Sequence, residues 1–343
     1  MSGSARIGQS APGETRPPRG TAFLWAGRML STQTGVLFGI DILVAVALSI
    51  ASPYFLSGMN LLAIGVAMAG SALAAIGSSL VLLTGGIDLS IGTSYGMAGI
   101  VVSHALLAGI PVLPSMALAL ASGMVIGAIN GLIITRLRVN PFITTLGTMT
   151  IGRGLINIFT KGYSISGLPD SFMQLLYLKI AGLPPSVAVM ILCTVIADLA
   201  LRWWKPARQL YYIGGSATYA RLIGINVNRA TTAAYMVSGL TAAAGGLLFT
   251  MRTGAGSQQA GLGLEMLAII APFLGGVGFG GQGTILAAFL GATLLGLIFN
   301  AIQLLGIPVL FQNVITGVFL VSAALIGVVR VRRAHIMQRM ERR

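Results

Sequence analysis

The amino-acid sequence predicts an all-α integral membrane protein with about ten transmembrane helices, some of them discontinuous. Of its 343 residues 55% are hydrophobic and only 8% are charged, and the mean hydropathy is +0.90. A soluble globular protein carries charge on roughly a quarter of its residues, and a disordered chain needs low hydrophobicity. The 47 glycines suit helices that pack closely in a bilayer, because small residues let backbones approach.

The chain divides into a membrane region and two polar tails. Residues 1–34 are rich in Gly, Pro and Ser and lack an apolar core with a cleavage site, so we expect an uncleaved, disordered cytoplasmic tail. Residues 35–330 form the predicted transmembrane domain, and 331–343 form a basic cytoplasmic tail. The predicted spans are 36–56, 61–83, 89–109, 115–135, 142–160, 184–203, 230–251, 263–277, 284–305 and 312–329.

The basic residues predict the orientation of these spans. With ten spans and both termini in the cytoplasm, all but four of the 21 Lys and Arg residues fall in cytoplasmic segments. This distribution follows the positive-inside rule. The net charge of +14 therefore indicates cytoplasmic loops, and nucleic-acid binding is not expected.

Two glycine-rich segments resemble each other. Residues 85–93 and 275–284 each open with Gly-Gly, close with Gly-Thr and precede an apolar run. Helix-breaking glycines at matching places predict an internal two-fold repeat around a central solute path. A chance likeness in a glycine-rich membrane chain is the alternative.

Catalytic and cofactor motifs are missing from the sequence. The single cysteine, Cys193, excludes an internal disulfide and a cysteine-based metal site. No phosphate-binding Gly-x-x-x-x-Gly-Lys-Ser/Thr loop, His-Glu-x-x-His or Gly-x-Ser-x-Gly motif occurs. The lone span histidine, His104, is more typical of packing than of metal binding. We therefore expect no enzyme activity and no cofactor bound by this chain.

The first glycine-rich segment holds the most informative acid. Asp88 follows Gly85 and Gly86 and, with Ser90, opens a new apolar run. It is predicted to be the N-cap of a helix that starts inside the membrane, which is tolerated only where the backbone is buried or lines a cavity. Structural capping and direct contact with a solute are both open.

Four other charged positions lie in or beside spans. Arg153 is a strong cation within a span and could pair with an acid or face the path. Glu265 precedes the weak eighth span, where the helix dipole favours an acid. Asp41 should face the bundle, and Asp198 should pair with Arg202 four residues on.

Neutral polar residues near the spans are candidates for lining a solute path. Each costs stability unless it is hydrogen-bonded, so it either lines the path or joins helices. These residues are Asn140, Asn300, Gln303 and Asn313.

The longest cytoplasmic interruption, 202–229, contains a predicted amphipathic helix over 218–225 that ends at a glycine. From these residues alone, the helix either lies on lipid headgroups or docks in a groove of a soluble partner.

Three stretches carry a resemblance to a known family. They are LTGGIDLSIG at 83–92, PFITTLGTM at 141–149 with RGL at 153–155, and YIGG at 212–215 followed by ARLIGI at 220–225. The chain resembles, from about 38 to 329, the permease subunits of ATP-binding-cassette (ABC) importers for ribose and related sugars. The resemblance implies that 35–330 is a permease domain in a multi-pass protein of the bacterial inner membrane, paired with a second permease copy or a paralogue.

The resemblance also implies partners and a coupling segment. A separate cytoplasmic ATPase would hold ATP and Mg²⁺, and a periplasmic or extracellular binding protein would deliver the solute. The 202–229 loop would be the coupling loop that docks on the ATPase. Its expected coupling residues are Gly214, Gly215, Thr218, Tyr219, Ala220, Arg221, Leu222 and Gly224.

Departures from the family pattern gather in the second half. Ser216 replaces a usual Asn, Met266-Leu267-Ala268 lacks an expected acid after Glu265, Pro272 interrupts an apolar stretch, and the second glycine-rich segment has drifted. These differences leave the solute and the identity of the second permease open. An ion- or proton-coupled secondary transporter and a non-transporting scaffold are the alternative hypotheses.

Overall fold

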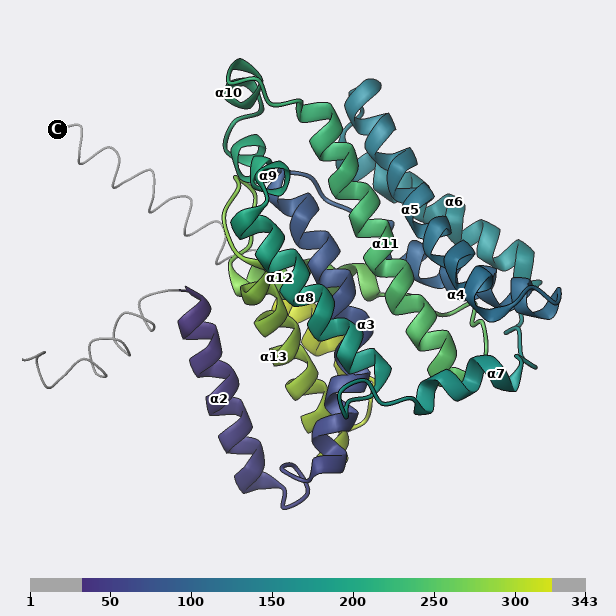
Figure 1. Ribbon diagram of the computed structural model, residues 1–343. Helices are drawn as coiled ribbons and strands as arrows, with labels where there is room; N and C mark the ends of the chain where they lie inside the picture. The colour runs from purple at the N-terminus through teal and green to yellow at the C-terminus, as the bar shows by residue number, and fades with distance from the viewer. Residues whose placement is uncertain (1–32, 323–343) are drawn as a thin grey trace, which may run out of the picture.

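The computed structural model describes residues 33–322, so the predicted tails and the end of the tenth span lie outside the described residues. The described part is a helical bundle (Figure 1). Its helices are α2 (Gln33–Ala51), α3 (Gly58–Leu83), α4 (Ile91–Leu107), α5 (Val112–Arg136), α6 (Pro141–Thr160), α7 (Asp170–Met173), the 3-10 turn η1 (Gln174–Tyr177), α8 (Pro185–Trp203), α9 (Lys205–Gly215), α10 (Ala217–Leu222), α11 (Val227–Thr253), α12 (Leu264–Gly275), α13 (Ile285–Leu304) and Phe311–Ser322.

The helices follow the predicted spans closely. Each of the first nine spans coincides with one helix, and a further helix begins near the predicted start of the tenth. The first helix ends five residues earlier than predicted, at Ala51, because Pro53 disfavours helical geometry in the residue before it. Within residues 33–322, six helices are both long and apolar enough to cross a membrane: α2, α3, α5, α8, α11 and α13. The count of ten spans stays a prediction.

Helix α3 occupies the centre of the bundle, with α11 and α4 on one side and α12 and α13 on the other (Figure 1). Most of its length is buried, whereas α2 lies at the edge and is largely exposed. Helices α5 and α11 cross at Gly123 and Gly239, where a Cβ on either residue would run into the other's carbonyl group. This close approach is the packing that the high glycine content predicts.

The bundle has two ends, named here after the short helices that mark them (Figure 1). The α10 end carries the α5–α6 loop together with α9 and α10. The α7 end carries the α2–α3 and α4–α5 turns, α7 and η1. Both glycine-rich segments lie toward the α10 end, where α3 passes into α4 and α12 passes into α13.

Candidate functional site

The first glycine-rich segment breaks the helical path inside the bundle. Helix α3 ends at Leu83, Gly85 takes a left-handed conformation (φ +84°), and α4 begins at Ile91. Gly86 lies against the Tyr235 hydroxyl group, in space that a Cβ would fill. The chain therefore turns in a place that only small residues allow, and α4 starts within the protein as predicted for a discontinuous helix.

Asp88 lies in this turn with only 1% of its surface exposed. Its carboxylate accepts hydrogen bonds from the Ser90 amide (2.9 Å), the Ser90 hydroxyl (2.6 Å) and the Ser238 hydroxyl of α11 (2.8 Å). The predicted N-cap assignment is wrong by two residues, because Ser90 occupies the N-cap position of α4. Asp88 instead closes the turn before the helix and ties it to α11.

Ser90 extends this polar network to α5 and α6. Its hydroxyl accepts a hydrogen bond from Asn130 Nδ2 (2.7 Å), and Asn130 Oδ1 accepts one from the Thr148 hydroxyl (2.6 Å). Asn130 and Ser238 were not among the predicted site residues, although polar side chains in apolar runs were the available signal. The network joins four helices around the start of α4.

Arg153 and Glu265 meet beside Gly92, in the first turn of α4. A Cβ on Gly92 would contact both Glu265 Oε2 and Arg153 Nη2. Arg153 Nη1 donates to the Ala260 carbonyl (2.8 Å), and Glu265 Oε1 accepts from the Gly263 amide (3.3 Å). The guanidinium is thus held by a backbone carbonyl, with the carboxylate nearby.

The other two charged positions behave as the sequence predicts. Asp41 of α2 is buried in the bundle. Asp198 and Arg202 form an ion pair (2.6 Å) one helical turn apart, near the end of α8.

The candidate path residues separate into two groups. Asn140 is the N-cap of α6 at the α10 end and accepts a hydrogen bond from the Phe142 amide (2.9 Å), and its place on a solute path stays a prediction. Asn313 is exposed on the last described helix. Asn300 and Gln303 of α13, in contrast, line a cavity, where Asn300 is buried and Gln303 is exposed.

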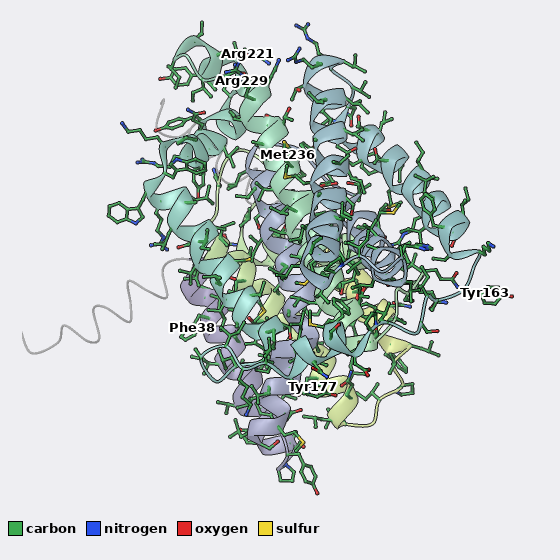
Figure 2. All side chains as sticks on the ribbon, turned by 45° about the vertical axis from the view of Figure 1, so that its right-hand side comes forward. Phe38, Tyr163, Tyr177, Arg221, Arg229 and Met236 are labelled. Atoms are coloured by element: carbon green, nitrogen blue, oxygen red, sulfur yellow. The ribbon has the colours of Figure 1, made fainter. Side chains whose placement is uncertain are left out.

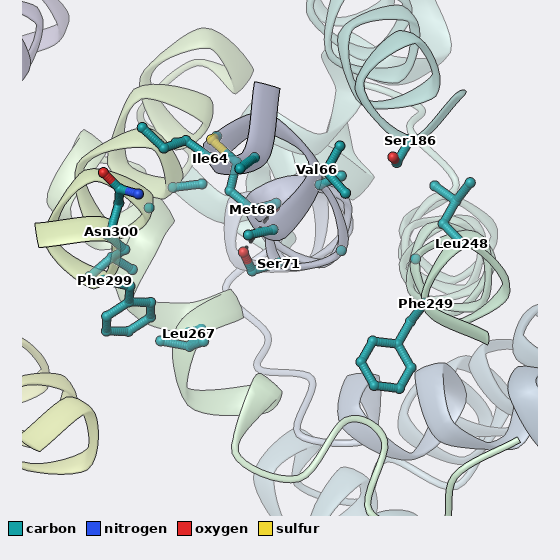
Figure 3. Close-up of a pocket in the computed structure, with 18 of the residues that line it drawn as sticks. Ile64, Val66, Met68, Ser71, Ser186, Leu248, Phe249, Leu267, Phe299 and Asn300 are labelled. Carbon is teal, nitrogen blue, oxygen red and sulfur yellow. Dashed lines mark hydrogen bonds between the residues drawn. The ribbon is translucent and has the colours of Figure 1, made fainter. Parts of the chain in front are cut away.

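This cavity has a volume of about 290 Å³ and lies between α3, α11, α12 and α13, with contributions from α4 and α8 (Figure 3). Asn300 exchanges two amide hydrogen bonds with Asn60 of α3 (2.9 and 3.2 Å) at its edge. Most of the lining is apolar or aromatic. The polar lining residues are Asn60, Ser71, Ser186, Arg252, Asn300 and Gln303.

The predicted coupling loop contains two helices where the sequence indicated one. Ser216 caps α10 by accepting from the Tyr219 amide (3.2 Å), and the chain leaves α10 through Gly224 at φ +84°. The additional helix, α9, begins with Lys205-Pro206 and buries Leu210 and Ile213. A proline in the first turn was the available signal for this helix start.

Helix α9 lies against both glycine-rich segments. A Cβ on Gly214 would run into the carbonyl of Leu83, the last residue of α3 before the first segment, and into the amide of Gly281 in the second segment. The Tyr211 hydroxyl donates to the Gly283 carbonyl (3.0 Å). Gly215, one residue further, faces open space, with no neighbouring atom within 4 Å of where a Cβ would stand. Gly214 therefore packs against the bundle rather than facing outward.

The residues of α10 divide into a buried and an exposed set. Ala220 is fully buried against Ile213 and Val227, so it cannot touch a docking partner directly. Tyr219 and Leu222 are 58% and 80% exposed, and Thr218 and Arg221 are exposed beside them. Arg221 lies at the tip of the α10 end, far from Tyr177 at the α7 end (Figure 2). The outward surface of α10 is thus Thr218, Tyr219, Arg221 and Leu222.

Comparison with known proteins gives consistent matches. The family model for the permease component of the branched-chain amino acid transport system matches residues 60–324. The ribose import permease protein of Bacillus subtilis (strain 168) is 35% identical over 297 residues, covering 86% of this chain and 92% of its own length.

Two further relatives differ in the solute that their names give. The autoinducer 2 import system permease protein of Enterobacter sp. (strain 638) is 35% identical over 303 residues, covering 87% of this chain and 86% of its own. The D-allose transport system permease protein of Escherichia coli (strain K12) is 31% identical over 291 residues, covering 84% and 89%. No solved structure matches the chain.

Proposed function

The chain belongs to the family of ABC importer permease components, and from that premise we propose that it carries a monosaccharide or a related small polar solute. The observation that carries the proposal is the agreement among the relatives. Those named for ribose, D-allose and autoinducer 2 are 31–35% identical and each covers at least 84% of this chain. Permeases of this family are multi-pass membrane proteins that work with an ATPase and a substrate-binding protein.

The proposed orientation places the α10 end in the cytoplasm. Arg136 and Arg138 lie in the α5–α6 loop, and Lys205, Arg208 and Arg221 lie on α9 and α10. Cytoplasmic loops carry such an excess of basic residues. The α7 end then faces the binding protein, and both termini lie in the cytoplasm.

The proposed coupling route runs through α10 and α9. The exposed Tyr219 and Leu222 suit docking of α10 in a groove of the ATPase, because a short helix with outward apolar side chains binds in this way. ATP and Mg²⁺ would be held by the ATPase, since this sequence has no phosphate-binding loop. Movement of α10 would reach both glycine-rich segments through the packing of Gly214.

A second permease, either another copy or a paralogue, completes the proposed transporter in the lipid bilayer. The two bundles would alternate between outward and inward openings. The solute would then be released into the cytoplasm after ATP binding and hydrolysis on the partner subunits. The first glycine-rich segment, held by Asp88, is the proposed discontinuity around which each bundle changes conformation.

The energy source distinguishes this proposal from ion-coupled transport. We expect uptake of labelled ribose or allose, measured as the difference between the native bacterium and a strain lacking this gene. The cells should keep their ATP by glycolysis and lack the proton-translocating ATP synthase. Arsenate, which depletes ATP, should abolish the gene-dependent uptake, whereas a protonophore should leave the rate of this uptake unchanged. Uptake that a protonophore abolishes while ATP is maintained would contradict the proposal.

A further inference from the structure

A groove on the outside of the bundle separates α8 from α11. Both helices pack against α3 but make few contacts with each other, so α3 lies between them (Figure 1). The groove has a volume of about 570 Å³, and its floor is formed by Ile76 and Leu80 of α3. It opens sideways, because the lining side chains Ile196 and Val237 are exposed. Since α3, α8 and α11 are all long and apolar enough to cross a membrane, the groove faces the bilayer.

The walls of this α8–α11 groove are as long as one leaflet of bilayer hydrocarbon. On α8 the lining runs from Cys193 to Trp204, and on α11 it runs in the opposite direction from Thr241 to Ala230. At 1.5 Å per residue, each of these stretches spans about 16 Å. The hydrocarbon core is about 30 Å thick, so one leaflet contributes about 15 Å. The groove therefore has the length of an acyl chain that runs from the headgroup level to the midplane.

The lining becomes polar at the α10 end of the groove. Trp204, Gln209, Asn226 and Arg229 all lie near this end, where α8 finishes and α11 begins. At the other end, the hydroxyl of Thr241 donates to a backbone carbonyl of its own helix (3.1 Å). Tryptophan is enriched where hydrocarbon meets headgroups, so Trp204 marks that level on α8. The polar end thus lies at the depth of the phosphates.

The charge at this end is positive. Arg229 lines the groove, and Lys205 and Arg208 lie on α9, which borders it. Figure 2 places Arg229 at the α10 end. Helices α9, α10 and α11 contain no Asp or Glu. The preceding acid in the chain, Asp198, pairs with Arg202 (2.6 Å) and accepts a hydrogen bond from the first turn of α13 (3.3 Å). The basic side chains at the groove are therefore available for an anion.

We propose that the α8–α11 groove binds an anionic phospholipid, with one acyl chain between the two helices and the phosphate at Arg229. An Arg guanidinium binds phosphate through two parallel hydrogen bonds, and basic pockets between membrane helices suit anionic headgroups. A zwitterionic lipid adds an ammonium, which Lys205 and Arg208 repel and which no acid on α9 or α11 accepts. Only the assignment to the cytoplasmic leaflet rests on the proposed function, through its orientation.

Photolabelling in nanodiscs tests this site on the full chain. The bilayer is phosphatidylcholine with a small fraction of a lipid that carries a diazirine in its acyl chain, either phosphatidylglycerol or phosphatidylcholine. Labelled peptides are identified by mass spectrometry. The phosphatidylglycerol label should concentrate on the α8 and α11 peptides that line the groove, whereas the phosphatidylcholine label should spread over the exposed helices. Both leaflets have the same composition, so the result does not depend on the orientation of the chain.

Two variants with matched controls connect the label to the groove. Arg229→Gln should reduce phosphatidylglycerol labelling of the groove about fivefold, which corresponds to about 1 kcal/mol for one basic side chain near a membrane surface. Arg136→Gln removes an exposed cation at the end of α5, on another side of α11, and should leave the labelling unchanged. Ala233→Phe fills the groove and should abolish the labelling, whereas Ala121→Phe, at an exposed position of α5, should not.

Equal labelling of the groove by the two lipids, or equal labelling of Arg229→Gln and Arg136→Gln, would overturn the site. Groove peptides that stay unlabelled while chemical cross-linking joins α8 or α11 to a second copy would also overturn it, because protein would then cover the groove. ATP-dependent sugar uptake without selective labelling would remove this site and leave the proposed function. Selective labelling without such uptake would remove the proposed function and leave the site.

Discussion

Replacing Gly214 with alanine is expected to leave little folded permease in the membrane, whereas the same change at Gly215 is expected to be harmless. A Cβ on Gly214 would run into the backbone of Leu83 and Gly281, and backbone cannot move aside as a flexible side chain can. Overpacking of this kind costs about 1–3 kcal/mol and sometimes more. At Gly215 the space is open, and alanine favours the helix by up to about 1 kcal/mol.

Because both variants carry the same glycine-to-alanine change, a difference between them reports the packing around Gly214 and not the substitution itself. Both variants are purified in the same detergent, and the measurements are the yield of monodisperse protein and its thermal midpoint. Gly214→Ala should lower both, and Gly215→Ala should match the wild type. Equal stability of the two variants would show that α9 is not packed between the two glycine-rich segments.

Replacing Asp88 with alanine is expected to destabilise the bundle by about 3 kcal/mol or more. The change removes three hydrogen bonds and leaves the Ser90 amide and the Ser238 hydroxyl buried without their acceptor. A hydrogen bond to a charged group contributes about 1.5–3 kcal/mol, and an unsatisfied buried donor adds its desolvation cost. Asp88→Asn keeps one acceptor oxygen for Ser90 and should be less damaging.

Asp170→Ala, at the exposed first residue of α7, is the control for this prediction. Thermal midpoints of the purified variants should fall in the order wild type and Asp170→Ala, then Asp88→Asn, then Asp88→Ala. Wild-type stability in Asp88→Ala would contradict the role of Asp88 in holding the turn. A stable Asp88→Asn protein that no longer supports uptake would favour direct contact with the solute.

The helices were predictable because their positions depend on local hydrophobicity. Stretches of about 20 apolar residues interrupted by Gly, Pro or charge set both ends of α3, α5 and α13 within a few residues. The break before α4 was predictable for the same reason, since Gly85-Gly86 and Asp88 stand in an otherwise apolar run.

Partners distant in the sequence were not predictable. Ser238 lies 150 residues from Asp88, and only the packing of α11 against α3 and α4 brings the two side chains together. The inward face of Ala220 likewise depends on α9 and α11, which cover it, so a short amphipathic pattern could not show which side is buried.

Two local features, in contrast, were available in the sequence. Asn140-Pro141 has the pattern of an N-cap followed by proline in the first turn, which indicates a helix start. Lys205-Pro206 carries a similar signal for α9. Helix α9 was not predicted because only one of its sides is apolar and buried, and its other side is polar and basic like the rest of the segment.

We propose that an ATPase drives this permease by docking on α10, and affinity capture from the native membrane measures this docking. Tagged wild type, Leu222→Asp and Tyr177→Asp are compared, since both altered side chains are about 80% exposed but lie at opposite ends. We predict that an ATPase with a Gly-x-x-x-x-Gly-Lys-Ser/Thr loop copurifies with wild type and Tyr177→Asp and is lost from Leu222→Asp. Equal capture of the ATPase by Leu222→Asp, or no ATPase with any form, would show that an ATPase does not dock on α10.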